Sequence, residues 1–117
     1  MSFRETPELT EDWWRPIATL RLDAPDLTHR SGIHFRPEDE GAGPHLLAVL
    51  ELSHSRQHFM LRNEVPHPEW GTTVLAPGRV PPAETAWREL FQALEVRDGE
   101  FELSPELKSG QSPHRVH

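Results

Sequence analysis

The sequence contains no cysteine. This absence excludes disulfide bonds, zinc sites built from thiolates and a cysteine nucleophile. A chain without cysteine fits any compartment, although small secreted domains often rely on disulfides. Any catalytic or metal-binding chemistry would therefore have to use histidine, carboxylate or hydroxyl side chains.

Long hydrophobic runs are also missing. The longest uninterrupted apolar stretch covers residues 46–50, which is far too short to span a bilayer. The first eight residues contain no apolar segment of the kind found at the centre of a signal peptide. With a mean hydropathy of -0.65, the chain is expected to be a cytoplasmic protein with no membrane partner.

Positive charge is scarce. Lysine and arginine number 12 and aspartate and glutamate 19, which gives a formal net charge of -7. Proteins that bind nucleic acids or anionic membranes usually present a basic patch, so direct binding to nucleic acid is not expected. An acidic surface suits a basic protein partner, because complementary potentials accelerate the encounter. Solubility alone also explains such a charge, and both explanations stay open.

The length of 117 residues fits one domain. A domain of this size buries roughly two-thirds of the surface that its unfolded chain exposes, so a self-sufficient core is feasible. The 12 prolines and 7 glycines predict short elements joined by long loops. We expect a polar N-terminal arm at 1–9, a single domain at 10–104 and a polar, flexible C-terminal tail at 105–117.

The clearest periodic pattern lies in residues 81–96 and predicts the principal helix. Apolar side chains recur three and four positions apart, and polar side chains occupy the opposite face. Two prolines suit the approach to the first turn, and Gly99 lies just beyond the end as a stop signal. The apolar stripe consists of Ala83, Ala86, Trp87, Leu90, Phe91 and Leu94.

Two apolar segments, 46–53 and 58–65, predict a β-hairpin with a four-residue loop. Alternation of apolar side chains indicates one buried face of a sheet, which the stripe of the helix should cover. The expected register places Leu52 opposite Phe59, Leu50 opposite Leu61 and Leu46 opposite Val65.

Four further segments predict strands, at 17–23, 33–36, 72–76 and 100–103. Thr10 is expected to cap a short helical turn that runs through Trp14. Residues 24–32 and 37–44 are expected to be loops, because they are rich in proline, glycine and acidic residues. The economical fold class is α+β, a mainly antiparallel sheet of about five to six strands with one principal helix packed on one face.

Eight histidines raise the question of a metal site. Histidine and carboxylate ligands without cysteine are able to hold zinc, iron or manganese. The candidate cluster consists of His54, His58, His67, Glu64 and Glu69. Because His54 and His58 would share a face only on a helix, the predicted hairpin removes this geometry. We therefore expect no metal and no cofactor.

Candidates for catalysis are weak. Glu51 would deserve interest as an acid or base only if a second layer covered its face of the sheet. Ser53, the nearby histidines and Asp39 supply the residue types of a catalytic triad, but no nucleophile-elbow motif surrounds the serine. Gly41 and Gly43 lack the spacing and the following helix of a phosphate-binding loop. No catalytic residue is predicted.

Two tryptophans and one acidic cluster are the candidate partner-binding residues. Adjacent tryptophans at 13 and 14 cannot both point into one core from a short helical turn. Trp70 follows two prolines in a loop, and exposed tryptophan is enriched at binding hot spots. Trp13 and Trp70 are therefore the candidates, and the alternative role is packing, with Trp14 at the end of the sheet and Trp70 at the edge of the helix. The acidic cluster, Glu38, Asp39 and Glu40, predicts an anionic surface.

These patterns favour a small, acidic, non-catalytic protein-binding module. It would dock on another, basic protein in the manner of a bacterial immunity or inhibitor protein. A homodimer formed through a sheet edge is a further expectation. The alternative is a small enzyme or ligand-binding domain with a pocket between helix and sheet that uses histidine or Glu51.

Overall fold

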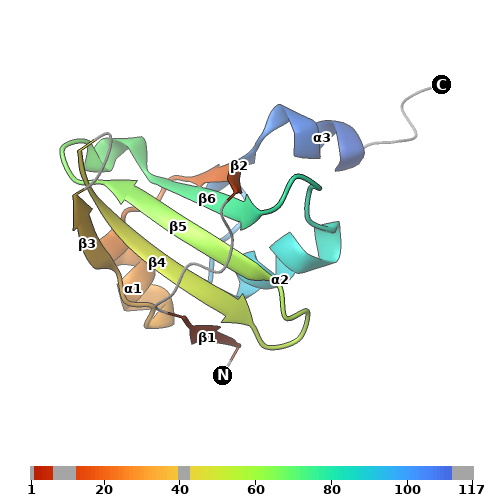
Figure 1. Ribbon diagram of the computed structural model, residues 1–117, viewed down its shortest axis with the longest axis horizontal. Coiled ribbons are helices and arrows are strands. Elements are labelled where there is room, and N and C mark those ends of the chain that lie inside the picture. The colour runs from red at the N-terminus through yellow and green to blue at the C-terminus, as the bar shows by residue number, and fades with distance from the viewer. Residues whose placement is uncertain (1, 7–12, 40–42, 112–117) are drawn as a thin grey trace.

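A computed structural model describes residues 2–6, 13–39 and 43–111. The strands form one seven-stranded sheet in the order β1-β4-β5-β6-β2-β7, with β3 also paired to β4 (Figure 1). Every one of these pairings is antiparallel. The strands are β1 (Phe3–Glu5), β2 (Trp14–Leu20), β3 (Arg36–Asp39), β4 (Pro44–Leu52), β5 (His58–Glu64), β6 (Thr72–Pro77) and β7 (Phe101–Leu103).

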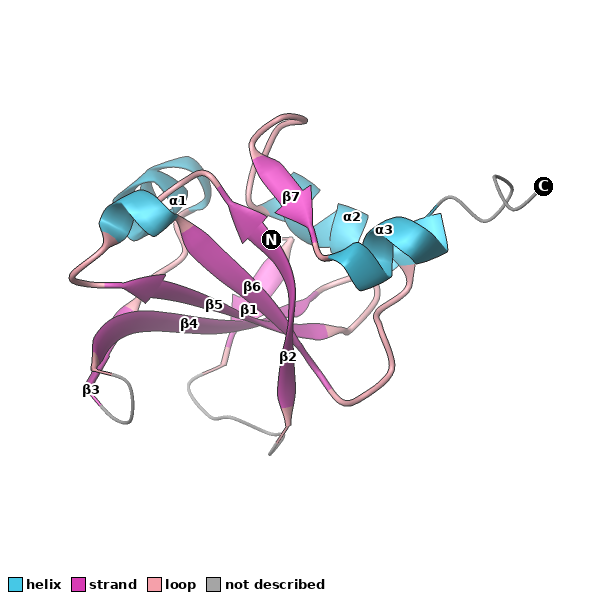
Figure 2. Cartoon of the chain, turned by 90° about the horizontal axis from the view of Figure 1, so that it is seen from above, coloured by secondary structure: helices cyan, strands magenta, loops and turns pink. Residues whose placement is uncertain are grey.

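The helices are α1 (Ala24–Ser31), α2 (Glu84–Ala93) and α3 (Pro105–Gln111), together with the 3-10 turn η1 (Pro68–Trp70). Figure 2 shows α1 and α2 on the same face of the sheet. The α+β class, with a mainly antiparallel sheet and one main helix, is therefore confirmed. The described part of the chain contains no helix that is both long and apolar enough to cross a membrane.

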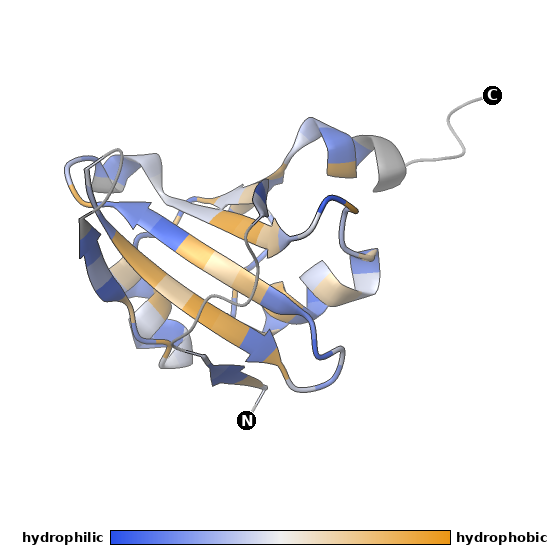
Figure 3. Cartoon of the chain, in the orientation of Figure 1, coloured by the Kyte–Doolittle hydropathy of each residue, from blue (hydrophilic) through white to orange (hydrophobic). Residues whose placement is uncertain are grey.

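The core lies between α2 and the sheet. The stripe of α2 from Ala86 to Leu94 is buried in one cluster with the sheet residues Leu50, Leu52 and Phe59, as predicted. Ala83 is the exception, since it is the N-cap residue of α2 and is exposed. Figure 3 shows the matching pattern, with the most hydrophobic stretches in the middle of β4 and β5.

A second, smaller apolar cluster lies on the opposite face of the sheet. It consists of Leu47, Val49, Met60 and Leu75, with Trp14 packed against it. Because side chains alternate between the two faces of a strand, these residues interleave with those of the main core. The sheet is therefore apolar on both faces in its centre, and polar side chains concentrate at its ends.

The helix α1 corrects the expected loop at 24–32. The Asp23 side chain accepts a hydrogen bond from the Asp26 backbone N–H, and the Asp26 side chain accepts one from Asp23 in return. Such a capping box satisfies amide groups that a helix start leaves unpaired. Pro25 fits the first turn, and Gly32 ends the helix with a left-handed φ of 83°. The same Pro25, Asp26 and Gly32 that predicted a loop are thus the residues that begin and end a helix.

The register of the β4–β5 hairpin also differs from the prediction. Leu50 lies opposite Phe59 and Ala48 opposite Leu61, a shift of two residues. The connection is five residues long, 53–57, rather than four. It is closed by the hydrogen bond from the Leu52 N–H to the Gln57 carbonyl at 2.9 Å. Because the shift is even, the side chains of the paired residues keep their predicted faces. Val65 is the exception, since it lies beyond the end of β5 and is 47% exposed.

Two other strands begin at positions that the sequence analysis did not predict. Trp14 starts β2, so the expected helical turn does not extend through it, and Thr10 lies outside the described residues. Pro16 is tolerated within β2 next to a register irregularity, which is a typical place for proline in a strand. The strand expected at 33–36 is instead β3, at Arg36–Asp39, which occupies part of the expected loop.

The helix α3 lies in the segment predicted to be a polar tail. Its Leu107 is buried in the main core cluster. Arg15 of β2 donates two hydrogen bonds to the Glu106 carboxylate, at 2.6 and 2.7 Å. These contacts attach α3 to the domain, and the boundaries at 10–104 and 105–117 stay predictions.

A bidentate ion pair joins α1 to the turn before β7 and makes stability depend on pH. Arg30 donates to both Glu100 oxygens, at 2.7 and 2.8 Å, and the Arg97 backbone N–H adds a third bond at 2.8 Å. These contacts, with the Arg30 hydrogen bonds first, lower the Glu100 pKa from 4.5 to about 2. The stabilisation is thus present above pH 4.5 and is lost as pH falls towards 2.

Glu100→Gln is therefore expected to lower the melting temperature at pH 7 and to flatten its fall between pH 5 and pH 2. Circular dichroism melts over this pH range measure both effects. Glu102→Gln is the matched control, because Glu102 makes one exposed ion pair with Lys108 at 3.3 Å. Equal pH profiles for Glu100→Gln and the wild type would contradict this account of the ion pair.

Candidate functional site

The most prominent exposed side chain that is held rigidly is Trp70. It ends η1 and is 60% exposed. Its ring stacks on His67, with 3.9 Å between the ring centroids and 11° between the planes. The His67 Nδ1 atom lies 3.3 Å from the Glu69 carboxylate. We call Trp70, His67 and Glu69 the Trp70 platform.

Buried polar groups hold the base of this platform. Asn63 and Thr72 are buried, and the Asn63 side-chain amide donates to the Gly71 carbonyl at 2.8 Å. The Thr72 hydroxyl donates to the Leu22 carbonyl at 2.7 Å. The turn itself is closed by the hydrogen bond from the Trp70 N–H to the His67 carbonyl at 3.0 Å. A side chain presented on such a fixed loop loses little conformational entropy when it binds.

The strand register brings part of the predicted acidic cluster to the same end of the sheet. Glu38 lies opposite His45, and His45 lies opposite Glu64, which directly precedes the η1 connection. In Figure 1, β3 and the green η1 turn accordingly lie at the same end of the sheet, with β4 between β3 and β5, the strand that η1 follows. The side chain of Asp39 and the whole of Glu40 lie outside the described residues.

Two of these carboxylates are already paired. Glu38 lies 3.5 Å from Arg36, and Glu64 lies 2.7 Å from Arg62. Glu69 carries the freer charge, with a side chain that is 66% exposed. Its own backbone N–H and then His67 lower the pKa of Glu69, so the group is anionic at neutral pH. Among the carboxylates that the structure describes at this end of the sheet, Glu69 is therefore the one without an arginine partner.

Trp13 does not join this site. It lies at the other end of β6, where the Gly78 N–H donates to the Trp13 carbonyl at 2.9 Å. Trp13 is 53% exposed, and the Arg79 guanidinium lies over its ring at 5.0 Å. The structure therefore separates the two predicted tryptophans and brings only Trp70 near the acidic residues.

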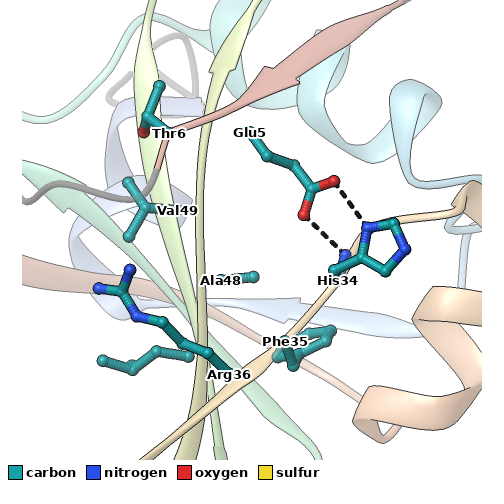
Figure 4. Close-up of a pocket in the computed structure, with 8 residues that line it drawn as sticks. Glu5, Thr6, His34, Phe35, Arg36, Ala48 and Val49 are labelled. Carbon is teal, nitrogen blue, oxygen red and sulfur yellow. Dashed lines mark hydrogen bonds and ion pairs between the residues drawn. The ribbon is translucent and has the colours of Figure 1, made fainter.

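A cavity of about 180 Å³ lies at the outer edge of β4, in the gap between β1 and β3 (Figure 4). One Glu5 oxygen lies 2.9 Å from the His34 Nδ1 atom, and the other accepts the His34 backbone N–H at 2.8 Å. The sequence analysis did not find this pair, because the two residues are 29 positions apart and no motif connects them. A carboxylate on Nδ1 is the arrangement that orients a histidine base in many enzymes.

The groups around this cavity do not converge on one point. Glu5 lies opposite Leu50 and Arg36 opposite Leu47, so the two side chains project from different faces of the sheet. The other lining residues are Thr6, Phe35, Leu47, Ala48 and Val49, which offer a single hydroxyl. The Glu5–His34 pair therefore has a structural role, since it joins β1 to the segment that precedes β3.

Glu51 is buried, but its surroundings are those of a structural acid. Its carboxylate pairs with Arg4 and, at 3.1 Å, with Arg56. The hydrogen bond from Arg4, followed by that from Arg56, lowers the pKa of Glu51. A general acid would need the opposite shift.

The histidines and the helix–sheet interface were the other sequence candidates. Within the ranges that the structure describes, no group of three or more histidine or carboxylate side chains is placed to hold a metal ion. His67, predicted as a candidate metal ligand, instead stacks on Trp70, for which the sequence contains no signal. The α2 side chains that face the sheet, such as Trp87 and Leu90, are almost completely buried against it.

Comparison with models of protein families, with curated proteins and with solved structures gave no match.

Proposed function

We propose that this protein is a small, non-catalytic binding module that docks on a basic protein through the Trp70 platform. It would act as an immunity or inhibitor protein does, by covering a basic surface of its partner in the cytoplasm. The observation that carries the proposal is Trp70 itself, a 60% exposed indole on a loop whose base is held by buried hydrogen bonds. Exposing so large an aromatic ring on a fixed loop is typical of binding hot spots.

The charges near the platform support a basic partner. Among the side chains that the structure describes, three carboxylates, at positions 38, 64 and 69, accompany two arginines at this end of the sheet. The Glu69 carboxylate is exposed at the rim, where charge governs the association rate more than the affinity. The aromatic platform would then supply most of the binding free energy, and the acidic rim the choice of partner.

The alternative of an enzyme or ligand-binding domain with a helix–sheet pocket has less support, because the α2 side chains fill that interface. A homodimer would use an outer sheet edge, on β1 and β3 or on β7. Each of these strands is short, and β3 carries charged residues and Pro37, features that discourage pairing between edges. We therefore favour a different protein as the partner.

Trp70→Ala is expected to abolish binding to that partner, with a loss of at least about 2 kcal/mol, or roughly 30-fold in affinity. Affinity capture from native cells, followed by mass spectrometry, identifies proteins retained by the wild type and lost with the variant. Calorimetry with the purified partner then measures the difference. Trp13→Ala is the matched control, because it removes an exposed tryptophan from the other end of the sheet.

Three results would contradict the proposal. They are equal losses with both variants, a partner of net negative charge, and a partner retained fully by Trp70→Ala. The association rate should also fall as salt increases, since the rim charges are exposed and screened.

A further inference from the structure

We infer that the Trp70 platform is a receptor for an arginine side chain of the partner, which stacks on the free face of the indole and pairs with Glu69. This inference rests on the proposed function and names the chemistry that the site recognises. Three observations support it. They are the exposed face of the Trp70 ring, the cation–π contacts of Trp13 and Trp87, and the position of the Glu69 carboxylate.

Among the residues that the structure describes, His67 is the ring that covers a face of the indole. His67 lies parallel to the Trp70 ring at 3.9 Å and so occupies one face at van der Waals distance. The ring is nevertheless 60% exposed, which leaves the other face to solvent. His67 also stiffens the ring, so a planar group on the free face would meet a surface that is already oriented.

Two of the other three tryptophans, Trp13 and Trp87, have an arginine over the ring, which the free face of Trp70 lacks. Arg79 lies over the ring of Trp13 at 5.0 Å, and Arg88 lies over the ring of Trp87 at 4.7 Å. Both are cation–π contacts, in which the negative face of the ring attracts the guanidinium. No arginine or lysine among the described residues occupies the corresponding position on Trp70. The partner would supply the cation that the chain supplies elsewhere.

Glu69 provides the second half of the receptor. One oxygen of its carboxylate lies 3.3 Å from the His67 Nδ1 atom, and the Glu69 side chain is 66% exposed, so negative charge lies at the surface next to the stacked pair, within reach of a guanidinium that extends past the edge of the indole. The side chain is exposed, and its pKa is lowered by its backbone N–H and by His67. A guanidinium combines a flat face for stacking with N–H groups at its edge for a carboxylate. A lysine ammonium is a compact charge that cannot present both surfaces in this way.

The test uses nuclear magnetic resonance of the full ¹⁵N-labelled chain, in which each tryptophan contributes one indole N–H signal. Single tryptophan-to-phenylalanine variants assign these signals. The probe is the blocked peptide Gly-Arg-Gly-Arg-Gly, compared with the same peptide carrying lysine or uncharged citrulline. We expect the arginine peptide to shift the Trp70 signal saturably and to bind about two- to fivefold more tightly than the lysine peptide.

The citrulline peptide should not shift the Trp70 signal, and the buried Trp87 signal should stay unchanged throughout. Glu69→Gln should weaken arginine binding by about two- to fivefold, as the loss of an exposed ion pair does. Four outcomes overturn the inference. They are equal shifts at Trp13 and Trp70, equal affinity for the lysine peptide, binding of the citrulline peptide, and no shift at the solubility limit of the arginine peptide.

Failure of this inference is distinguishable from failure of the proposed function. One result would be a basic partner that fails to bind Trp70→Ala but binds the wild type equally well after its own arginines are changed to lysine. This result would support the proposed function and exclude arginine recognition. A wild-type dimer that dissociates in the Trp70→Ala variant would show that the occupant is a second copy, and would overturn the assignment to a different protein. Light scattering of both proteins at matched concentration makes this comparison.

Discussion

Replacing Trp87 by alanine should lower the free energy of unfolding by about 3–5 kcal/mol, the range for large aromatic residues removed from a core. Trp87 is 2% exposed and lies within 5.6 Å of the Phe91 ring and 6.3 Å of the Phe101 ring, measured between centroids. Its removal leaves a cavity between α2 and β7 that these rings, already packed against each other at 4.4 Å, cannot close without moving.

Urea denaturation followed by circular dichroism measures this loss, with Trp70→Ala as the matched control. The control removes the same side chain from a position that is 60% exposed, so it should cost under about 1 kcal/mol. A loss well below 1 kcal/mol for Trp87→Ala would mean that α2 does not contribute its stripe to the core. A loss above about 2 kcal/mol for Trp70→Ala would show that the platform is structural.

The helix α2 could be predicted because its signal is local. Six apolar positions with a period near 3.6 residues indicate both the helix and the face that it buries, before any partner is known. The helix α1 carries a different local signal, the reciprocal capping of Asp23 and Asp26, in a segment with little apolar periodicity. The capping box marks the start of α1 in the structure, whereas the sequence analysis predicted a loop there because apolar periodicity was absent.

The hairpin register shows where local patterns stop being sufficient. Alternation has a period of two, so a slip of two residues leaves the pattern of buried faces unchanged. The actual register depends on the turn, where Arg56 adopts a left-handed φ of 65°. Glu89 of α2 also accepts the backbone N–H groups of His54 and Ser55, at 2.9 and 3.0 Å. This contact joins residues about 35 positions apart, and no sequence window contains both.

The candidate site likewise combines features that a local sequence pattern predicts with features that depend on the tertiary fold. Exposure of Trp70 could be anticipated from its proline-rich loop, but the stacked His67 could not, because stacking depends on the 3-10 turn that brings the rings together. Proximity of Glu38 to this loop follows from the order of β3, β4 and β5, which the sequence analysis left open. The Glu5–His34 pair forms because β1 and β3 both pair with the same edge of β4, and no local sequence pattern predicts it.

Gly71 is the second position where a single change should have a large effect, because it combines two constraints. Its φ is +78°, a conformation that is unfavourable for residues with a side chain by about 1–2 kcal/mol. A Cβ atom at this position would also collide with the backbone carbonyl of Leu20. A collision with backbone atoms requires one strand to move, and overpacking of this kind typically adds about 1–3 kcal/mol. Gly71→Ala should therefore cost about 2–5 kcal/mol.

Gly78→Ala separates the two constraints. Gly78 has a similar φ of +84°, but an added Cβ would meet no atom within 4 Å. Its substitution should cost only the conformational part, about 1–2 kcal/mol. If urea denaturation gave equal losses of unfolding free energy for the two variants, the close approach of Gly71 to Leu20 would contribute nothing to the cost of Gly71→Ala.

The same substitution connects the fold to the proposed site. Gly71 directly follows Trp70, and its carbonyl accepts the hydrogen bond from buried Asn63 that holds the platform. A shift of this backbone would move the indole relative to Glu69, so Gly71→Ala should weaken partner binding even at temperatures where the variant is fully folded. Gly78→Ala should leave binding unchanged. If Gly71→Ala bound the partner as tightly as the wild type, the rigidity of the loop would have no part in recognition.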